Sequence, residues 1–149
     1  MIRDFAPGLR HGYVVCQGAF ATFNTVKVLP KLAQAGINVK VIAAVSEELF
    51  ERQPEAYRRS VLPNGAKQDM MCVTGGTRRV WPRSNVGAQA DDYSLTADWD
   101  NQWLTGGLEA DVIAEAHLDP DWVFKGVKRF ADERTARLKA QRAALDSLE

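Results

Sequence analysis

"GYVVCQGAFATFNTVKVLPKLAQAGINVKVIAAV", residues 12–45, is the stretch that decides the fold class. Residues 12–17 open it with a short, nearly continuous apolar run, which is typical of a strand buried on both faces. Apolar residues then recur at three- and four-residue steps as far as Gly36, which predicts a helix with a glycine cap. Residues 37–45 predict a second strand, and such a strand–helix–strand unit is parallel and right-handed. The predicted buried face of the helix consists of Phe23, Val26, Leu29 and Ala33.

Strands and helices keep alternating after this unit, which indicates a three-layer α/β domain. The last helix is expected to begin with Asp119 as its cap and Pro120 at the first helical position. Its final part, about residues 131–149, is expected to be a terminal helical extension. The further predicted elements are two short helices within 47–63, strands over 70–74 and 93–98, and helices over 106–118 and 119–148.

The pair of short helices within 47–63 carries both charged and apolar side chains. Ser46 can cap the first helix, and Pro54 restarts the second at its first turn. We expect Leu49, Phe50 and Tyr57 to anchor this connector to the sheet. The charged side chains of the connector are then expected to face solvent or a neighbouring domain or chain. They are Glu51, Arg52, Arg58 and Arg59.

The length and the charge of the chain limit the classes of protein to which it can belong. A chain of 149 residues fits one domain, residues 1–149, with a sizeable core. The 19 Lys and Arg residues equal the 19 Asp and Glu residues in number, so the overall charge favours neither nucleic acid nor a membrane as partner. No apolar stretch approaches the roughly 20 residues that span a bilayer, and the N-terminus lacks the apolar core of a signal peptide. We therefore expect a cytoplasmic protein.

The residue types that most often carry chemistry are few. Cys16 and Cys72 each lie inside an apolar run, which predicts two buried thiols rather than a disulfide. His11 lies in the N-terminal lead-in, and His117 ends an amphipathic helix, where histidines commonly bond the last carbonyls. No metal-ligand spacing is present. The sequence thus predicts no catalytic, cofactor-binding or metal-binding residue in this chain.

The glycine pair after the strand at 70–74 is the best candidate for binding a small anion. Two glycines let the backbone approach an anion closely, and nearby arginines would add positive charge. The pattern lacks the full dinucleotide or P-loop spacing, so a glycine-rich turn with solvated arginines is the competing interpretation. The candidate anion-binding residues are Gly75, Gly76, Thr77, Arg78 and Arg79.

Tryptophans gather in the second half of the chain, and tryptophan with arginine is typical of interface anchors. Packing in the core is an equally good explanation. The loop over 74–92 is long enough to be functional or to contain a short helix near Thr77–Trp81. The candidate interface residues are Trp81, Trp99 and Trp103.

The segment "INVKVIAAVSEELFERQPEAYRRSVLP" (37–63) resembles part of the C-terminal domain of transketolases. There a strand is followed by a small residue, an acid, Leu-Phe, a Gln, Tyr-Arg and Val-Leu-Pro. "VTGGTRRVWPRSNVG" (73–87) is similar to the family's strand, glycine turn and tryptophan-bearing helix, and Asp98 matches the Asp that ends its last strand. "ADDY" (90–93) is also similar to the related pyruvate dehydrogenase E1 chains. The matching residues of the first segment are Glu48, Leu49, Phe50, Gln53, Tyr57, Arg58, Val61, Leu62 and Pro63.

The similarity covers about residues 10–130 and implies both a fold and a role. The implied fold is an α/β/α sandwich on a mixed, mostly parallel sheet of about five strands. The implied role is a non-catalytic C-terminal domain or small subunit of a ketol-transferring enzyme, in a homo- or hetero-oligomer. The family holds thiamine diphosphate and a divalent metal between two preceding domains, so both are expected in partner domains. After Asp98, "WDNQWLTGG" replaces the family's glycine- and serine-rich turn, which puts any contact of that turn in doubt.

Two hypotheses of different classes follow. In the first, this chain is part of a transketolase-like transferase and is inactive alone. In the second, it is an independent regulatory or binding module that recognises a phosphorylated or carboxylated metabolite at Gly75–Arg79.

Overall fold

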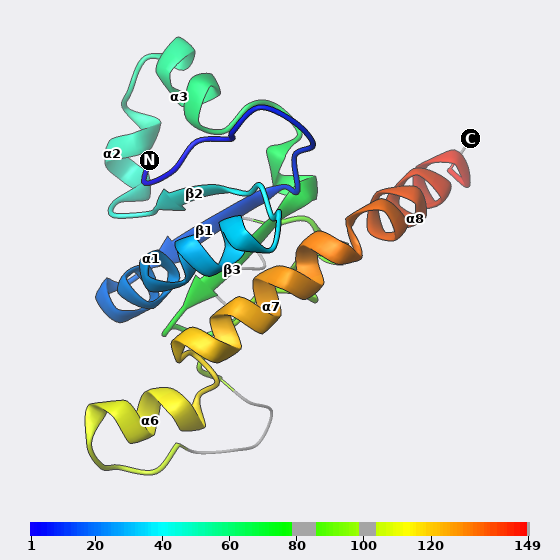
Figure 1. The fold of residues 1–149 in the computed structure, drawn as a ribbon. Coiled ribbons are helices and arrows are strands. Elements are labelled where there is room, and N and C mark those ends of the chain that lie inside the picture. Colours follow the sequence, from blue (N-terminus) through cyan, green and yellow to red (C-terminus); the bar gives the residue numbers. More distant parts are fainter. Residues whose placement is uncertain (79–85, 99–103, 149) are drawn as a thin grey trace.

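Three parallel strands form the centre of the structure, a computed structural model that describes residues 1–78, 86–98 and 104–148 (Figure 1). The central strand β1 (Tyr13–Gln17) pairs on one side with β2 (Lys40–Ala43) and on the other with β3 (Met70–Thr74). Both pairings are parallel, which confirms the predicted strand–helix–strand unit. The strand order is β2-β1-β3.

One face of this sheet is covered by the two long helices α1 (Ala19–Gln34) and α7 (Pro120–Asp132), which lie in front of it in Figure 1. Side chains alternate between the two faces of a strand, so every second strand residue points toward these helices. The larger core forms here, because long apolar faces of both helices meet the sheet. Its fully buried members include Val14, Val41, Val73, Leu32, Val127 and Phe130.

The opposite face has a thinner cover of short helices. These are α2 (Glu47–Glu51), α3 (Glu55–Val61), η1 (Ala66–Asp69) and α5 (Ala88–Asp91). A smaller cluster joins them to the sheet, with Phe50 and Leu62 packed against it in partly buried positions. The buried residues of this smaller cluster are Val15, Ile42, Val61, Met70 and Val86.

The expected five-strand mixed sheet is wrong for the part of the chain that the structure describes, where the sheet has three strands. The strand expected over 93–98 contributes a single parallel bridge between Leu95 and Val73. Its first residues are held otherwise, because the backbone N–H groups of Tyr93 and Ser94 donate to the carbonyls of α5. At the other edge, Arg3 forms an antiparallel bridge with Val41.

The buried face of α1 differs from the prediction at three of its four positions. Phe23, Val26 and Ala33 are exposed, whereas Leu29 is partly buried against the larger core. The fully buried residues of the helix are Ala21, Asn24, Thr25, Val28 and Leu32. Two polar residues on this face explain the error, since both satisfy their hydrogen bonds internally. Asn24 Nδ2 donates to the carbonyl oxygen of Leu118 at 2.9 Å, and Thr25 Oγ1 donates to that of Ala21 at 2.8 Å.

The chain after residue 108 is mainly helical. The helix α6 (Glu109–Glu115) is shorter than predicted. Asp119 caps α7 as expected, because its side chain accepts hydrogen bonds from the backbone N–H groups of Asp121 and Trp122. The predicted long terminal helix is divided at Glu133, where α7 gives way to α8 (Arg134–Asp146). Among the described residues, no helix combines the length and the apolar character that a bilayer crossing requires.

Ion pairs and a hydrogen bond join α8 to η1 and α7, a feature that the sequence did not reveal. Arg137 is buried and donates from Nη2 to Asp69 Oδ1 at 2.8 Å and from Nη1 to the carbonyl oxygen of Phe130 at 2.8 Å. Arg134 Nε donates to the other carboxylate oxygen of Asp69 at 2.7 Å. The beginning of α8 is therefore packed against the body, while its end projects away from it (Figure 1).

Candidate functional site

The glycine turn after β3 is bonded to the protein's own carboxylate. Asp98 accepts a hydrogen bond from Thr77 Oγ1 at 2.7 Å and another from the backbone N–H of Arg78 at 2.7 Å. The backbone N–H of Gly76 donates to Thr74 Oγ1 at 2.9 Å. The donors that the sequence assigned to a bound anion thus face a side chain of the same chain.

The guanidinium of Arg78 is likewise engaged. Its Nε donates to Asp91 Oδ2 at 3.2 Å, and its Nη2 donates to the Asp91 carbonyl oxygen at 2.8 Å and to Asp92 Oδ1 at 3.3 Å. Arg79 lies outside the described residues. Binding of an external anion at Gly75–Arg79 stays a prediction, and such an anion would have to displace Asp98 and compete with two further carboxylates.

The same contacts set the charge state of Asp98. Partial burial raises its pKa, but the hydrogen bonds from the backbone N–H of Arg78 and the hydroxyl of Thr77 outweigh this effect. The pKa of Asp98 is therefore lowered, and the carboxylate is ionised at neutral pH.

Gly75 has a packing role in this turn. A Cβ atom at Gly75 would lie 2.5 Å from Cζ of the Phe20 ring, which is closer than side-chain atoms approach. At Gly76, the nearest atom to such a Cβ would be Thr74 Oγ1 at 3.3 Å. The first glycine thus makes room for an aromatic ring at the start of α1, a role that needs no ligand.

Both cysteines are buried free thiols, as predicted. Burial raises the pKa of Cys16 to about 11. Burial also raises the pKa of Cys72, and the nearby Cys16 adds to this shift. A thiol must ionise to act as a nucleophile, so neither is prepared for covalent chemistry at neutral pH.

The two histidines take part in local structure. His11 Nδ1 accepts a hydrogen bond from the backbone N–H of Asn38 at 2.9 Å, which ties the N-terminal lead-in to the residues before β2. His117 adopts a positive φ of 55° after α6, and its ring stacks on Trp122 with a centroid distance of 4.0 Å. The ammonium group of Lys125 lies 4.7 Å from the centroid of the same tryptophan ring.

The candidate interface residues Trp81, Trp99 and Trp103 lie outside the described residues, so their role stays a prediction. The described residues also contain no group of three or more His, Cys, Asp or Glu side chains that could hold a metal ion.

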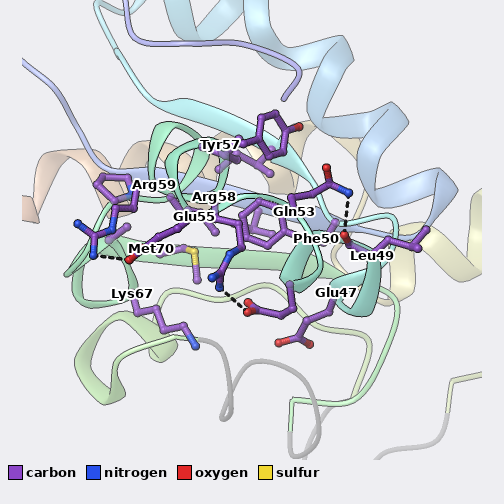
Figure 2. Close-up of a pocket in the computed structure, with 18 of the residues that line it drawn as sticks. Glu47, Leu49, Phe50, Gln53, Glu55, Tyr57, Arg58, Arg59, Lys67 and Met70 are labelled. Atoms are coloured by element: carbon purple, nitrogen blue, oxygen red, sulfur yellow. Dashed lines mark hydrogen bonds and ion pairs between the residues drawn. The ribbon is translucent and has the colours of Figure 1, made fainter.

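A pocket of about 710 Å³ lies beside α2 and α3 on the thinly covered face of the sheet (Figure 2). We call it the α2–α3 pocket. Its apolar wall comes from β1, β2, β3 and the short helices, and includes Val15, Ile42, Phe50, Val61 and Met70. Such a volume lies within the range of about 300–1,000 Å³ that is usual for binding sites. No sequence pattern indicates this pocket, because it forms between segments distant along the chain.

Ion pairs cross the rim of the α2–α3 pocket. Arg58 Nη1 lies 2.7 Å from Glu51 Oε2, so this pair joins α3 to α2 (Figure 2). Arg59 Nη2 lies 2.5 Å from Glu55 Oε1 within α3. Lys67 also lines the pocket.

The anchors predicted for the α2–α3 connector are only partly right. Ser46 caps α2 by accepting a hydrogen bond from the backbone N–H of Leu49 at 3.2 Å, as expected, and Phe50 packs against the smaller cluster. Leu49 and Tyr57, however, are exposed. Because α2 is only five residues long and buries none of them, Leu49 cannot reach the sheet from its outer side. Pro54 directly precedes α3, at its N-cap position.

Comparison with known proteins finds similarity to one domain of transketolases. A family model described as "Transketolase-like TK C-terminal domain" matches residues 22–98, which are more than half of the chain. Transketolase 2 of Escherichia coli K12 is 31% identical over 99 residues, which cover 62% of this chain and 14% of that protein.

Solved transketolase structures share the fold. A transketolase from Leishmania mexicana superimposes with a TM-score of 0.64 at 18% identity, over 87% of this chain and 17% of that one. A transketolase from Pichia stipitis in complex with sedoheptulose 7-phosphate gives a TM-score of 0.61 at 20% identity, over 88% of this chain and 18% of that one. This chain spans less than a fifth of the length of each of these relatives. By its match over residues 22–98, the chain belongs to the family of transketolase-like C-terminal domains.

Proposed function

We propose that this chain is the C-terminal domain or small subunit of a transketolase-like, ketol-transferring enzyme and that it supports assembly of that enzyme. The match of residues 22–98 to the C-terminal domain family is the observation that carries the proposal. The length of the match also supports the proposal, because the region aligned with this chain is less than a fifth of each transketolase.

The hydrogen bonds of the polar side chains support a role in which this chain does not itself catalyse a reaction. Asp98 and Arg78 are bonded within the protein, and His11 accepts a backbone hydrogen bond. A nucleophile or general base needs an orienting partner and a free approach to substrate. These groups are arranged instead to hold neighbouring segments together.

The cofactor and partners follow from the same proposal. The described residues contain no cluster of His, Cys, Asp or Glu side chains that could hold a metal ion. Thiamine diphosphate and a divalent metal would be held by partner domains, in one homo- or hetero-oligomer with this domain. The balanced charge, 19 basic against 19 acidic residues, supports a protein partner over nucleic acid or a membrane. We place the enzyme in the cytoplasm.

Reconstitution tests the proposal. This chain and the thiamine-diphosphate-binding domains from the same organism, expressed as a separate polypeptide, are expected to form a stable complex that transfers ketol groups between sugar phosphates. This chain alone is expected to show no transfer. Turnover by the purified chain alone would contradict the proposal, and so would the failure of the two polypeptides to associate.

A further inference from the structure

We propose that Asn64 is a site of spontaneous covalent modification, at which the backbone nitrogen of Gly65 displaces the side-chain amide and an aspartate or isoaspartate results. Asparagine is among the thermolabile residue types, but only some of its surroundings allow this reaction. Three properties of this pair carry the inference: the residue that follows Asn64, the turn in which both lie, and their hydrogen bonding. The inference does not depend on the proposed function.

The reaction uses only the chain and water. The backbone N–H of Gly65 gives its proton to water, the nitrogen forms a bond to Cγ of Asn64, and the bond between Cγ and Nδ2 breaks with release of ammonia. A water molecule then opens the resulting cyclic imide at either of its carbonyl groups. One opening gives aspartate, and the other gives isoaspartate, in which the main chain runs through the former side chain. The net change replaces a neutral amide by a carboxylate.

The residue after Asn64 hinders this reaction least. Glycine has no Cβ atom, so its nitrogen is open to the neighbouring side chain and its backbone adopts a wide range of conformations. Asn64 is the only asparagine of the chain that precedes a glycine. By contrast, Asn24 precedes Thr25 and Asn38 precedes Val39, whose branched Cβ atoms are stiff and crowd the backbone nitrogen.

The structure places Asn64 and Gly65 at the tip of a tight turn between α3 and η1. Gly65 has a φ of 83° and a ψ of −9°, and the backbone N–H of Ala66 donates to the carbonyl oxygen of Pro63 at 3.0 Å. These are the features of a type II turn with glycine at its third position. Asn64 and Gly65 are both exposed, and a Cβ atom at Gly65 would meet no other atom within 4 Å. The turn therefore leaves room for the imide ring to close and for water to enter.

Hydrogen bonds do not restrain the two reacting groups. Among the residues that the structure describes, neither the side-chain amide of Asn64 nor the backbone N–H of Gly65 has a hydrogen-bond partner. The turn is held by its neighbours instead, since the carbonyl oxygen of Gly65 accepts from the backbone N–H of Gln68 at 3.0 Å. The Asn64 side chain can thus rotate toward the Gly65 nitrogen without breaking a bond.

Two other asparagines of the described residues serve as internal controls, because both are buried and bonded. Asn38 Nδ2 donates to the carbonyl oxygens of Ala6 at 2.8 Å and Leu9 at 3.0 Å, and its Oδ1 accepts from the backbone N–H of Ala6 at 2.9 Å. Asn24 Nδ2 donates to the carbonyl oxygen of Leu118 at 2.9 Å. Ring closure at either residue would first require local opening of the fold.

Each conversion at Asn64 would add a negative charge to the lining of the α2–α3 pocket, to which Asn64 and Gly65 belong. The variant Asn64→Asp carries the same charge on an ordinary main chain. It therefore provides a standard for anion-exchange chromatography, and an aged wild-type sample should develop a component that elutes with it.

The test incubates the whole chain at physiological temperature and neutral pH, once native and once in urea, and follows each asparagine by peptide mapping with mass spectrometry. Conversion adds about 1 Da to a peptide, and isoaspartyl methyltransferase labels the isoaspartate product. We expect native Asn64 to convert at a rate within about threefold of its rate in urea, whereas the native fold should slow Asn24 and Asn38 by about tenfold or more. In urea, Gly65→Ala should slow the conversion of Asn64, and this comparison does not require the variant to fold.

The outcomes decide the inference. Conversion of native Asn64, at a rate close to that in urea and with release of ammonia, supports it. If the native fold slows Asn64 as strongly as it slows Asn38, the turn protects the residue and the inference is wrong. It is also wrong if Gly65→Ala converts as fast as wild type in urea, because the Gly65 nitrogen would then not be the attacking group.

Discussion

Arg137 of α8 and Asp69, the last residue of η1, form a buried ion pair across 68 positions of sequence, with 2.8 Å between Nη2 and Oδ1 and only 1% of the arginine side chain exposed. Asp69 also accepts a hydrogen bond from Arg134, so one carboxylate balances two guanidinium groups. The Arg137 guanidinium further lies over the Phe130 ring, 3.9 Å from its centroid. This carboxylate therefore ties η1 to the first two turns of α8.

Replacing Asp69 by Ala should lower the free energy of unfolding by about 3–5 kcal/mol, because it leaves Arg137 buried without its counterion. Denaturant unfolding measures this change, and limited proteolysis should show earlier cleavage within α8. Asp146→Ala is the matched control, since Asp146 pairs with Arg142 on the exposed side of the same helix at 3.5 Å. That control should stay within about 0.5 kcal/mol of wild type. Equal losses for the two variants would contradict the role given to Asp69.

Gly75→Ala should destabilise the protein by about 1–3 kcal/mol, because its new Cβ would overlap the Phe20 ring. Gly76→Ala should cost less, since the nearest atom to its Cβ lies 3.3 Å away. Thermal unfolding of the two variants gives the comparison. In Phe20→Ala, the further cost of Gly75→Ala should largely disappear, because the ring is gone. Additive losses in the double variant would show that Gly75 is required for another reason.

Asp98→Ala should turn the glycine turn into a weak site for inorganic phosphate. The change removes the carboxylate that now accepts hydrogen bonds from the backbone N–H of Arg78 and from the hydroxyl of Thr77, so that a phosphate oxygen could take its place. We expect millimolar phosphate to raise the melting temperature of the variant and to leave that of wild type unchanged. A phosphate effect on wild type, lost in Arg78→Ala with Arg79→Ala, would favour the independent anion-binding module instead.

The dependence of stability on acid pH should reveal the contribution of the Asp98 carboxylate. Because the pKa of Asp98 is lowered in the folded protein, its contribution to stability is complete above the ordinary value of 3.8 and is lost as pH falls through the lowered pKa. The difference in melting temperature between wild type and Asp98→Asn should be constant between about pH 5 and pH 7 and should shrink below about pH 4. A difference that grows toward low pH would have the wrong sign.

Cys16 and Cys72 should resist a water-soluble thiol reagent in the folded protein. Both are buried, and the pKa of Cys16, raised to about 11, leaves very little thiolate at pH 8. We expect no labelling by dithiobis-nitrobenzoate of the native chain and labelling of both thiols in denaturant. Rapid labelling of one thiol in the native chain would indicate a local opening of the sheet.

Elements whose signals are local could be predicted from sequence. The apolar runs of β1 and β3 and the caps Ser46 and Asp119 depend on neighbouring residues alone, and all four are found in the structure. The buried face of α1 depends on distant partners. Asn24 is buried because the Leu118 carbonyl lies beside its amide, and no periodicity over 19–36 could indicate that contact.

In the candidate site, too, features with a local sequence signal could be predicted and features that depend on distant residues could not. The glycine turn after β3 was found from its sequence, but its donors meet Asp98 and its arginine meets Asp91, which are 20 and 13 residues away from Arg78. The α2–α3 pocket had no local signal at all. Leu49 and Tyr57 are predicted to anchor the connector to the sheet because they are largely apolar, but hydrophobicity alone cannot distinguish such a contact from an exposed side chain beside a pocket.

The bridge between Arg3 and Val41 matters for how this domain is handled. Arg3 and Ile2 occupy the hydrogen-bonding groups of Val41, on the side of β2 that no other strand of the described residues covers. An uncovered parallel strand offers a template on which foreign chains can assemble. Trimming the first five residues would unmask it, and fibrillar deposits during purification would be the foreseeable result. An affinity tag placed there should leave Ile2 and Arg3 free to pair.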